Sequence, residues 1–269
     1  GGYLIVEESQ YDTVASDPIA AKYLRQFVQG KYMLNGTPYW CLWLKDAPLD
    51  AIARSGLIQQ RLAQVSASRL KSPTKSVNEF ARRPHLFTQD RQPDTRYFAL
   101  PEVSSENRTW IPGRFYGPEV IAGNKLIIFP GAEPWHAALL QSSMFMTWVH
   151  VFAGRLESRP SISPGLAYFP IPFPAADDSL RNDLSAAWTS VEGTRAAQEG
   201  TTLKQLYQDS AMPEALKAAH DTLDSIVDQA FGTKSICTNA DERKRILFTR
   251  YVELTTRDQL PTPGKTRAR

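Results

Sequence analysis

The sequence predicts an α/β protein in which a region with a mixed sheet is followed by a small all-helical region. Short β-prone stretches separated by glycine turns occupy much of the first 130 residues. A stretch with five prolines then covers residues 158–174, and beyond it apolar residues recur at helical spacing. We therefore expect one domain at 1–174, a helical domain at 175–256, and a basic, disordered tail at 257–269.

The composition is that of an ordinary globular protein. Of the 269 residues, 42% are hydrophobic and 22% are charged, and the net charge is +3. Cys41 and Cys237 lie far apart without a CxxC spacing, which argues against a disulfide framework or a zinc ribbon and fits a reducing cytoplasm. No apolar run is long enough for a membrane span. The chain opens on GGYLIVEE without a methionine, so we interpret it as a piece of a longer protein.

Four elements are expected in the first 70 residues: a strand at Tyr3–Val6, a helix at 17–30, a buried strand at 38–45 and an amphipathic helix at 57–70. The helix at 17–30 carries signals at both ends. Asp17 can cap it, Pro18 suits its first position and Gly30 can end it. Its apolar residues Ile19, Tyr23 and Phe27 share one face.

The next elements alternate between strands and one long helix. Strands are expected at 96–103, 109–112 and 125–130, with Gly113, Gly117 and Gly123 in the turns between them. A single helix is expected from Trp135 to Arg155, because Leu140, Met144, Trp148 and Phe152 fall four apart. Three further helices are indicated by the apolar stripes Leu180–Leu184–Trp188–Val191 and Leu216–Leu223–Val227 and by residues 241–254.

Sequence signatures of catalysis are missing from this chain. It has no phosphate-binding GxxxxGK[ST] loop, no GxGxxG turn and no HExxH pair. Ser142 and Ser143 lack the GxSxG setting of a nucleophile elbow. The four histidines (85, 136, 150 and 220) form no close pair, and we interpret them as structural. We therefore expect no catalytic site, no metal and no cofactor within these residues.

A basic segment runs from Arg69 to Arg96. Its seven basic residues are Arg69, Lys71, Lys75, Arg82, Arg83, Arg91 and Arg96, against the acidic Glu79, Asp90 and Asp94. Interleaved hydroxyl residues make this composition typical of phosphate contacts. A solvent-exposed helix face without a ligand would have the same composition. The turn at 101–108 adds Ser104, Ser105 and Arg108. Candidate contacts to a nucleic-acid backbone are Arg69, Lys71, Lys75, Ser105 and Arg108.

Several motifs in fixed order resemble one family. They are YLRQFVQG (23–30), NGTPYWCLWL (35–44), SRLKS (68–72), LPEVSSENRTWIP (100–112), SSMFMTWVHVFAGRL (142–156), YFPIPFP (168–174), TLKQLY (202–207) and MPEALKAAHDTLDSIVDQAF (212–231). This order is similar to the C-terminal part of the MmeI-like family, which comprises single-chain type IIG (IIL) restriction–modification enzymes and related adenine-specific DNA methyltransferases. The resemblance covers the chain from Gly1 to about Leu254.

The resemblance implies a target recognition domain that reads double-stranded DNA, followed by a small helical domain. It also implies an upstream methyltransferase domain of the same polypeptide. That upstream domain would hold S-adenosylmethionine and the catalytic loop, which agrees with the missing motifs. Whether a nuclease domain also precedes it stays open.

The resemblance further implies three pairs of base-reading positions, which fall on Glu102 with Asn124, on Lys125 with Ser161, and on Glu157 with Arg159. Their chemistry suits the role, because glutamate accepts from cytosine N4 and arginine donates twice to guanine. Glu157 and Arg159, two apart on an extended segment, would point to one side and read one C·G pair. The expected pattern is C-G-A-C, in which the adenine is methylated.

Two other interpretations are weighed against DNA reading. The helical third could be a docking platform of a structural or protein-interaction module, and the chain could be a free-standing enzyme. The missing motifs weigh against the enzyme. Salt-sensitive binding to duplex DNA would separate the reading module from the docking platform.

Overall fold

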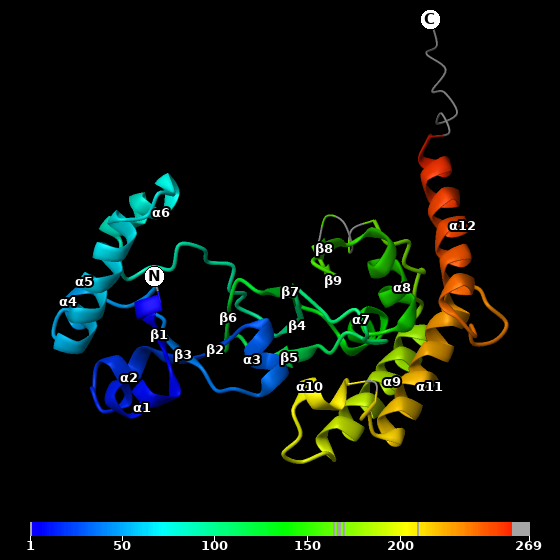
Figure 1. Ribbon diagram of the computed structural model, residues 1–269, viewed down its shortest axis with the longest axis horizontal. Coiled ribbons are helices and arrows are strands. Elements are labelled where there is room, and N and C mark those ends of the chain that lie inside the picture. Colours follow the sequence, from blue (N-terminus) through cyan, green and yellow to red (C-terminus); the bar gives the residue numbers. More distant parts are fainter. Residues whose placement is uncertain (1, 164, 166–167, 169, 209, 260–269) are drawn as a thin grey trace, which may run out of the picture. The chain divides into compact units, whose positions relative to one another are not determined.

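The computed structural model describes residues 2–163, 165, 168, 170–208 and 210–259 (Figure 1). The chain forms two compact units. Unit 1 comprises Gly1–Pro101 and Arg114–Gly131, and unit 2 comprises Glu102–Gly113 and Ala132–Arg269. Unit 2 thus contains residues from both sides of position 174, and the division at 174 stays a prediction.

The first sheet of unit 1 is mixed, as the sequence predicts. Its strands follow the order β1 (Ile5–Val6), β3 (Trp40–Leu42), β2 (Leu24–Val28) and β6 (Ile121–Ala122). Strand β3 pairs antiparallel with both β1 and β2, whereas β2 pairs parallel with β6. The parallel pair joins segments almost 100 residues apart, Phe27 lying opposite Ile121.

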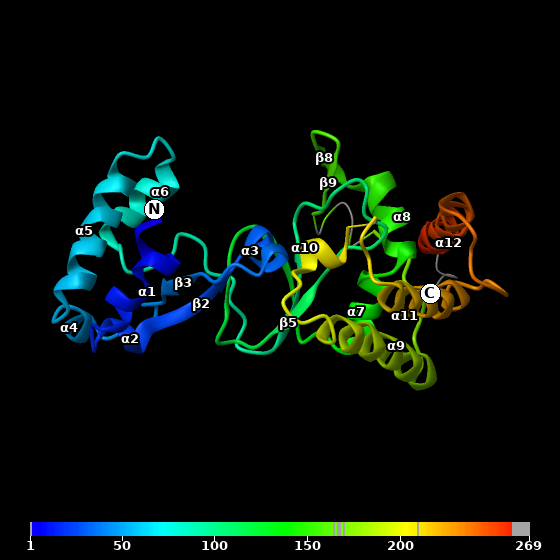
Figure 2. The ribbon, with the colours of Figure 1, turned by 60° about the horizontal axis from the view of Figure 1, so that its bottom comes forward.

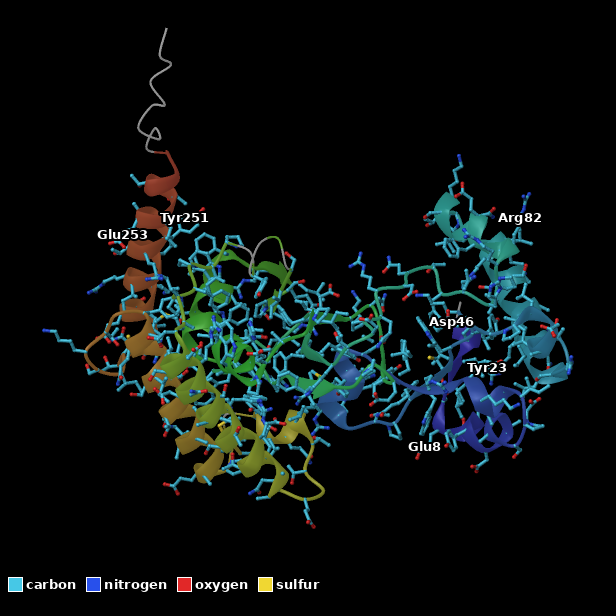
Figure 3. All side chains as sticks on the ribbon, turned by 180° about the vertical axis from the view of Figure 1, so that it is seen from behind. Glu8, Tyr23, Asp46, Arg82, Tyr251 and Glu253 are labelled. Carbon is cyan, nitrogen blue, oxygen red and sulfur yellow. The ribbon has the colours of Figure 1, made fainter. Side chains whose placement is uncertain are left out.

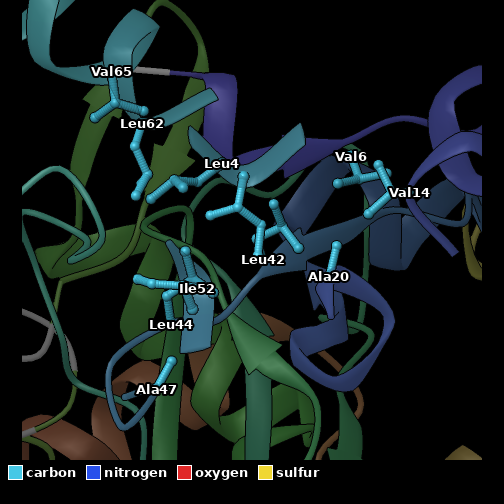
Figure 4. Close-up of a cluster of buried hydrophobic side chains, with 11 residues drawn as sticks. Leu4, Val6, Val14, Ala20, Leu42, Leu44, Ala47, Ile52, Leu62 and Val65 are labelled. Carbon is cyan, nitrogen blue, oxygen red and sulfur yellow. The ribbon is translucent and has the colours of Figure 1, made fainter. Parts of the chain in front are cut away.

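Short helices complete unit 1: η1 (Gly2–Leu4), α1 (Glu8–Ala15), α2 (Ala20–Tyr23), α3 (Gly30–Asn35), α4 (Leu49–Ile52), α5 (Gly56–Leu70), α6 (Lys75–Glu79) and η2 (Phe80–Arg82). Side chains from η1, α1, α2, α4 and α5 and from β1 and β3 form one apolar core (Figure 4). Leu42, Leu44 and Ile58 are fully buried in it. Helix α5 matches the predicted helix at 57–70, and Ser55 caps it by accepting from Ile58 N at 3.0 Å.

The second sheet of unit 1 is antiparallel, in the order β5 (Arg114–Tyr116), β4 (Tyr97–Pro101) and β7 (Leu126–Pro130). All five residues of the central strand β4 are buried. The Tyr97 hydroxyl donates to Val120 O at 2.7 Å, so its polar end is satisfied inside the core. Strands β4 and β7 lie within the predicted stretches 96–103 and 125–130.

The predicted helix at 17–30 is wrong beyond Tyr23. Asp17 accepts from Ala20 N at 2.8 Å just before α2, but the N-cap residue of α2 is Ile19 and not Asp17, and Leu24–Val28 form the strand β2 instead of further helical turns. The four-residue spacing of apolar side chains was compatible with a helix. Pairing with β3 on one side and β6 on the other outweighs that local preference. Gly30 starts α3 rather than ending a helix.

Three other predicted elements need correction. Only Ile5–Val6 of the stretch 3–6 is a strand, and 109–112 is no strand, since the ladder starts later at Arg114. The apolar pattern at 109–112 suggested a strand, but Trp110 and Ile111 are buried in a segment that pairs with no strand. The helix predicted from 135 to 155 is two helices, since Ser142 caps a new one by accepting from Phe145 N at 3.1 Å.

Unit 2 is mainly helical. Its helices are α7 (Pro134–Leu140), α8 (Ser143–Phe152), α9 (Asp178–Ala196), α10 (Leu203–Leu206), α11 (Glu214–Ala230) and α12 (Ala240–Gln259). Helix α9 packs against α7 and α11, and α12 packs against α8 (Figure 1). The three C-terminal stripes are thus confirmed as helices α9, α11 and α12. Helix α12 continues past 256 to Gln259, and the rest of the predicted tail lies outside the described residues.

A buried polar network lies within unit 2. Arg195 of α9 donates to the Tyr207 hydroxyl at 2.7 Å, to Gly113 O at 3.0 Å and to Gln141 Oε1 at 2.5 Å. The Tyr207 hydroxyl lies 2.7 Å from Nε2 of His220, which is itself fully buried. Since the arginine can only donate to the hydroxyl oxygen, that hydroxyl donates its proton to a neutral His220.

Replacing His220 by glutamine is expected to reduce the acid sensitivity of the chain. Burial and the nearby Arg195 lower the pKa of His220 well below 6.5 in the folded protein. The unfolded chain binds a proton there below pH 6.5, so the unfolding free energy falls with pH, by about 1.4 kcal/mol per unit. Urea titrations between pH 6.5 and 5 should give a flatter profile for the variant.

Asp224, one turn further along α11, acts in the opposite direction. Burial raises the pKa of its carboxyl to about 6, so below pH 6 the folded protein binds a proton that the unfolded chain does not, which adds stability. This contribution is present in the wild type and in His220→Gln, and it cancels when the two profiles are compared. Parallel profiles for the two proteins would contradict the assignment of a neutral His220.

No helix among the residues that the structure describes is long and apolar enough to cross a membrane.

Candidate functional site

A short β-hairpin projects from unit 2 beside α8 (Figure 2). Its strands are β8 (Gly154–Leu156) and β9 (Arg159–Ser161), and Leu156 pairs with Arg159. Glu157 and Ser158 therefore form a two-residue turn. Such turns require a left-handed backbone at the first position, and Glu157 has φ 58°.

The backbone at Glu157 is strained. A left-handed conformation costs a side chain with a Cβ about 1 kcal/mol, which is why glycine or asparagine usually occupies it. Within the described part of the chain, every other residue with a positive φ is a glycine. Strained residues of this kind gather at functional sites, where a specific side chain outweighs the cost. The strain supports a role for Glu157 independently of any motif.

Glu157 and Arg159 lie side by side on the hairpin. Arg159 Nη2 donates to Glu157 Oε2 at 2.7 Å. The Arg159 side chain is 44% exposed and the Glu157 side chain is 77% exposed. An ion pair this exposed adds little stability. Along β9, Arg159 is exposed whereas Pro160 and Ile162 are buried, so the strand turns one face to the core and one to solvent. The pair presents an acceptor and a donor together on the solvent face.

Three residues that the sequence analysis missed hold the turn in place. Arg155 donates to Ser158 O at 3.2 Å and to His150 O, at the end of α8, at 2.9 Å. The Ser158 hydroxyl donates to Glu106 Oε1 at 2.7 Å, and this hydrogen bond lowers the pKa of the Glu106 carboxyl. The two bonds of Arg155 are local, whereas the bond from Ser158 to Glu106 joins segments 52 residues apart, which no local pattern indicates.

The segment after β4 runs along β9 inside unit 2. Ile162 N donates to Glu102 O at 2.7 Å, and Ser104 N donates to Pro160 O at 3.1 Å. Val103 lies opposite Ser161 in an antiparallel bridge. Unit 2 thus brings together four of the six predicted base-reading residues: Glu102, Glu157, Arg159 and Ser161.

Ser105 and Arg108, two predicted backbone contacts, lie on the loop that follows this segment. The Ser105 hydroxyl accepts from Asn107 N at 3.3 Å, and Arg108 N donates to Ser105 O at 3.3 Å. These bonds close a compact turn within unit 2.

The other two predicted base-reading residues, Asn124 and Lys125, lie in unit 1 on the turn between β6 and β7, and both are exposed. Asn124 Oδ1 accepts from Gln29 Nε2 at 3.1 Å, which adds a polar residue that the sequence analysis missed because it placed Gln29 inside a helix. A Cβ on residue 30 would lie 2.8 Å from Lys125 O, which is too close. The turn that carries Lys125 can therefore pack against α3 in this way only because residue 30 is a glycine.

The basic segment divides into structural and exposed residues. Arg69 is only 4% exposed, and its guanidinium donates to the carbonyls of Phe80, Arg83 and Leu86 at 2.6–3.1 Å. Its guanidinium is thus buried and bonded to three carbonyls of the protein's own backbone, and the predicted DNA-backbone contact at Arg69 is corrected to a structural role. Lys71 and Lys75 are exposed, as is Arg82, which Figure 3 labels in the same region.

No group of three or more histidine, cysteine, aspartate or glutamate side chains that could hold a metal ion occurs in the part of the chain that was described.

Two family models match the chain: the target recognition domain of MmeI at residues 1–175 and the C-terminal domain of MmeI at residues 176–258. DNA methyltransferase A of Bacillus subtilis (strain 168) is 34% identical over 258 residues, which are 96% of this chain and 29% of the relative. The solved structure of the type IIL restriction–modification enzyme MmeI in complex with DNA matches with a TM-score of 0.91 and 34% identity, over 95% of this chain and 34% of that one. The chain therefore spans about a third of either relative.

Proposed function

This chain belongs to the MmeI family, of which it comprises the target recognition and C-terminal domains, and we propose that it selects the DNA sequence for an N6-adenine DNA methyltransferase. Its fold agrees closely with an enzyme solved on DNA. The observation that carries the proposal is the exposed Glu157–Arg159 pair on the strained hairpin turn. A strained turn that displays one acceptor and one donor suits the reading of a base pair.

The chemistry of the pair sets the base that it selects. In the major groove cytosine presents the N4 amino group, a donor that Glu157 can bind. The paired guanine presents O6 and N7, two acceptors that the Arg159 guanidinium can bind with both arms. Glutamate followed by arginine therefore selects a C·G pair in one orientation.

The remaining base-reading residues extend the motif. We assign a cytosine to Glu102 with Asn124 and a guanine to Lys125 with Ser161, which gives C-G-A-C with the adenine as the methylated base. Glu102 and Ser161 are half-buried, whereas Asn124 and Lys125 are exposed. Gln29 donates to Asn124 and so fixes the orientation of the Asn124 amide. Its own side-chain amide also has the donor and acceptor that suit a contact with adenine.

Contacts to the DNA backbone are assigned to Lys71, Lys75, Ser105 and Arg108, and Arg69 is left out. Lysines supply charge to phosphates, and serine hydroxyls supply hydrogen bonds. Methyl transfer from S-adenosylmethionine and extrusion of the target adenine belong to a methyltransferase domain that precedes this region in the parent protein. We place the protein in the cytoplasm, where the buried free thiols of Cys41 and Cys237 stay reduced.

Replacing both Lys71 and Lys75 by alanine is expected to weaken duplex binding equally for matched and unmatched sequences. Each phosphate contact contributes about −0.9 to the slope of log K against log salt, so the double variant should lower the magnitude of that slope by about 2. The measurement is a salt series of fluorescence anisotropy with the full-length protein.

Lys217→Ala is the matched control. Lys217 is an exposed lysine of α11 that pairs with Asp221 at 2.6 Å, and its removal should leave the slope unchanged. A double variant with the wild-type slope would overturn the assignment of Lys71 and Lys75. Binding that does not respond to salt at all would favour a protein-interaction module over DNA reading.

A further inference from the structure

We propose that Asp224, on helix α11, is a positioning residue for sequence reading, so that the C-terminal helices set the geometry of the base-reading elements in unit 2. This inference rests on the proposed function. It goes beyond it by assigning to the helical region a part in sequence discrimination.

Asp224 links two separate segments through one buried carboxylate. Only 3% of the residue is exposed. One oxygen accepts from Trp110 Nε1 at 3.0 Å and from the Ser143 hydroxyl, and the other accepts from Ser143 N at 2.7 Å. Trp110 belongs to the segment that begins at Glu102, and Ser143 is the first residue of α8.

The first link fixes the segment that carries Glu102. Its start is held against β9 by the bond from Ile162 N to Glu102 O at 2.7 Å. At its far end Gly113 donates to Gln141 Oε1 at 3.1 Å and accepts from Arg195 at 3.0 Å. Trp110 also stacks on His220 with ring centroids 4.6 Å apart. The helices α9 and α11 therefore hold this segment through directional contacts close to its end.

The second link runs along α8 to the hairpin. Asp224 fixes the first residue of this ten-residue helix, and at its other end His150 O accepts from Arg155 at 2.9 Å. Arg155 in turn holds Ser158 O in the turn beside Glu157. A hydrogen-bonded helix transmits a shift at one end to the other, so the position of the turn depends on the bond at Ser143.

Buried polar groups also join helix to helix in unit 2, as in the Arg243–Asp228 pair between α12 and α11, whereas the partners of Asp224 lie on the segment that begins at Glu102 and on α8. Fully buried apolar side chains fill the rest of the helical core, among them Leu184, Val191, Leu216 and Leu223 on α9 and α11. Burying a carboxylate costs free energy, and such groups are best explained where they specify one arrangement among several. Apolar residues at 224 would fill space but would not orient Trp110 and Ser143.

The test compares Trp110→Phe and Ser143→Ala in the full-length protein by sequencing the methylated motifs in cells. Trp110→Phe removes the indole donor and should relax the base assigned to Glu102, with about tenfold more methylation at sites that carry another base there. Ser143→Ala keeps the backbone bond and should relax the base assigned to Glu157 and Arg159, by a smaller factor. Asp224→Asn should relax both positions together.

Val191→Ala is the control, because it removes buried apolar volume from α9 in the same unit without touching the polar links. When its thermal stability matches that of Trp110→Phe and Ser143→Ala, Val191→Ala should lower methylation equally at all sites and leave the methylated motif unchanged. If Trp110→Phe and Ser143→Ala also keep the motif, the positioning role is wrong. The Glu157→Lys/Arg159→Asp variant separates the two proposals. An unchanged motif in that variant would contradict base reading by Glu157 and Arg159, whereas a changed motif there, together with an unchanged one in Trp110→Phe and Ser143→Ala, would contradict only the positioning role of Asp224.

Discussion

Replacing Glu157 by lysine together with Arg159 by aspartate in the full-length protein is expected to change the last base of the methylated motif from C to G. The exchange keeps one cation and one anion on the hairpin but reverses which residue carries the donor. Lysine then meets guanine O6 and N7 where glutamate met cytosine N4. A bidentate base contact is worth about 1–3 kcal/mol of discrimination, so the preference should reverse by roughly tenfold or more. Methylation-motif sequencing measures this directly.

A charge exchange elsewhere is the matched control. Lys217→Asp with Asp221→Lys reverses an exposed ion pair on α11, which spans 2.6 Å in the native chain, and it should leave the motif unchanged. Lysine at 157 meets the same backbone strain as glutamate, because both side chains are unbranched at Cβ. A motif that keeps its last C in the Glu157→Lys/Arg159→Asp protein would show that this hairpin does not read that base.

Replacing Arg243 by methionine is expected to produce the largest loss of stability, about 3–5 kcal/mol in unfolding free energy. Arg243 donates to both carboxylate oxygens of Asp228, at 2.9 and 2.8 Å, and the Asp228 side chain is 0% exposed. Methionine fills the space of the arginine stem but leaves a buried negative charge without its partner. The penalty comes from that charge and not from the lost attraction alone.

Urea unfolding followed by tryptophan fluorescence is a suitable measurement, since Trp110, Trp135, Trp148 and Trp188 all lie in unit 2. The double variant Asp228→Leu/Arg243→Met removes the stranded charge and should recover most of the loss. Lys217→Met breaks an exposed pair and should change stability by no more than about 1 kcal/mol. An equal loss in Arg243→Met and Lys217→Met would contradict the buried-charge explanation.

The C-terminal helices could be predicted because each carries a long amphipathic stripe, so that local pattern and tertiary packing agree. In α9, Leu184, Trp188 and Val191 lie on the stripe and all are buried. The stretch at 24–28 shows the limit of such patterns. Its apolar spacing fits a helix, but its fate is decided by pairing with Trp40–Leu42 and Ile121–Ala122, which are remote in sequence.

The candidate site divides in the same way. Glu157 and Arg159 were expected on one extended segment, but Glu157 lies in the hairpin turn and only Arg159 lies on a strand, so their side chains meet because of the turn and not because of strand alternation. Glu106 and Gln29 join the site only through partners 52 and 95 residues away, and no local signal marks them. Asp224 was hidden for another reason. An aspartate on an amphipathic helix is normally exposed, and Asp224 is buried only because Trp110 and Ser143, which are remote in sequence, pack against it.

The left-handed turn at Glu157 also limits how the specificity of this protein can evolve. Glycine, asparagine and aspartate adopt such a backbone at the least cost, whereas valine, isoleucine and threonine are the most strongly disfavoured. Arg159 lies on a regular strand and meets no such restriction. New specificities should therefore arise from a small repertoire at position 157 and a wide one at position 159, so that the second residue adapts to the first.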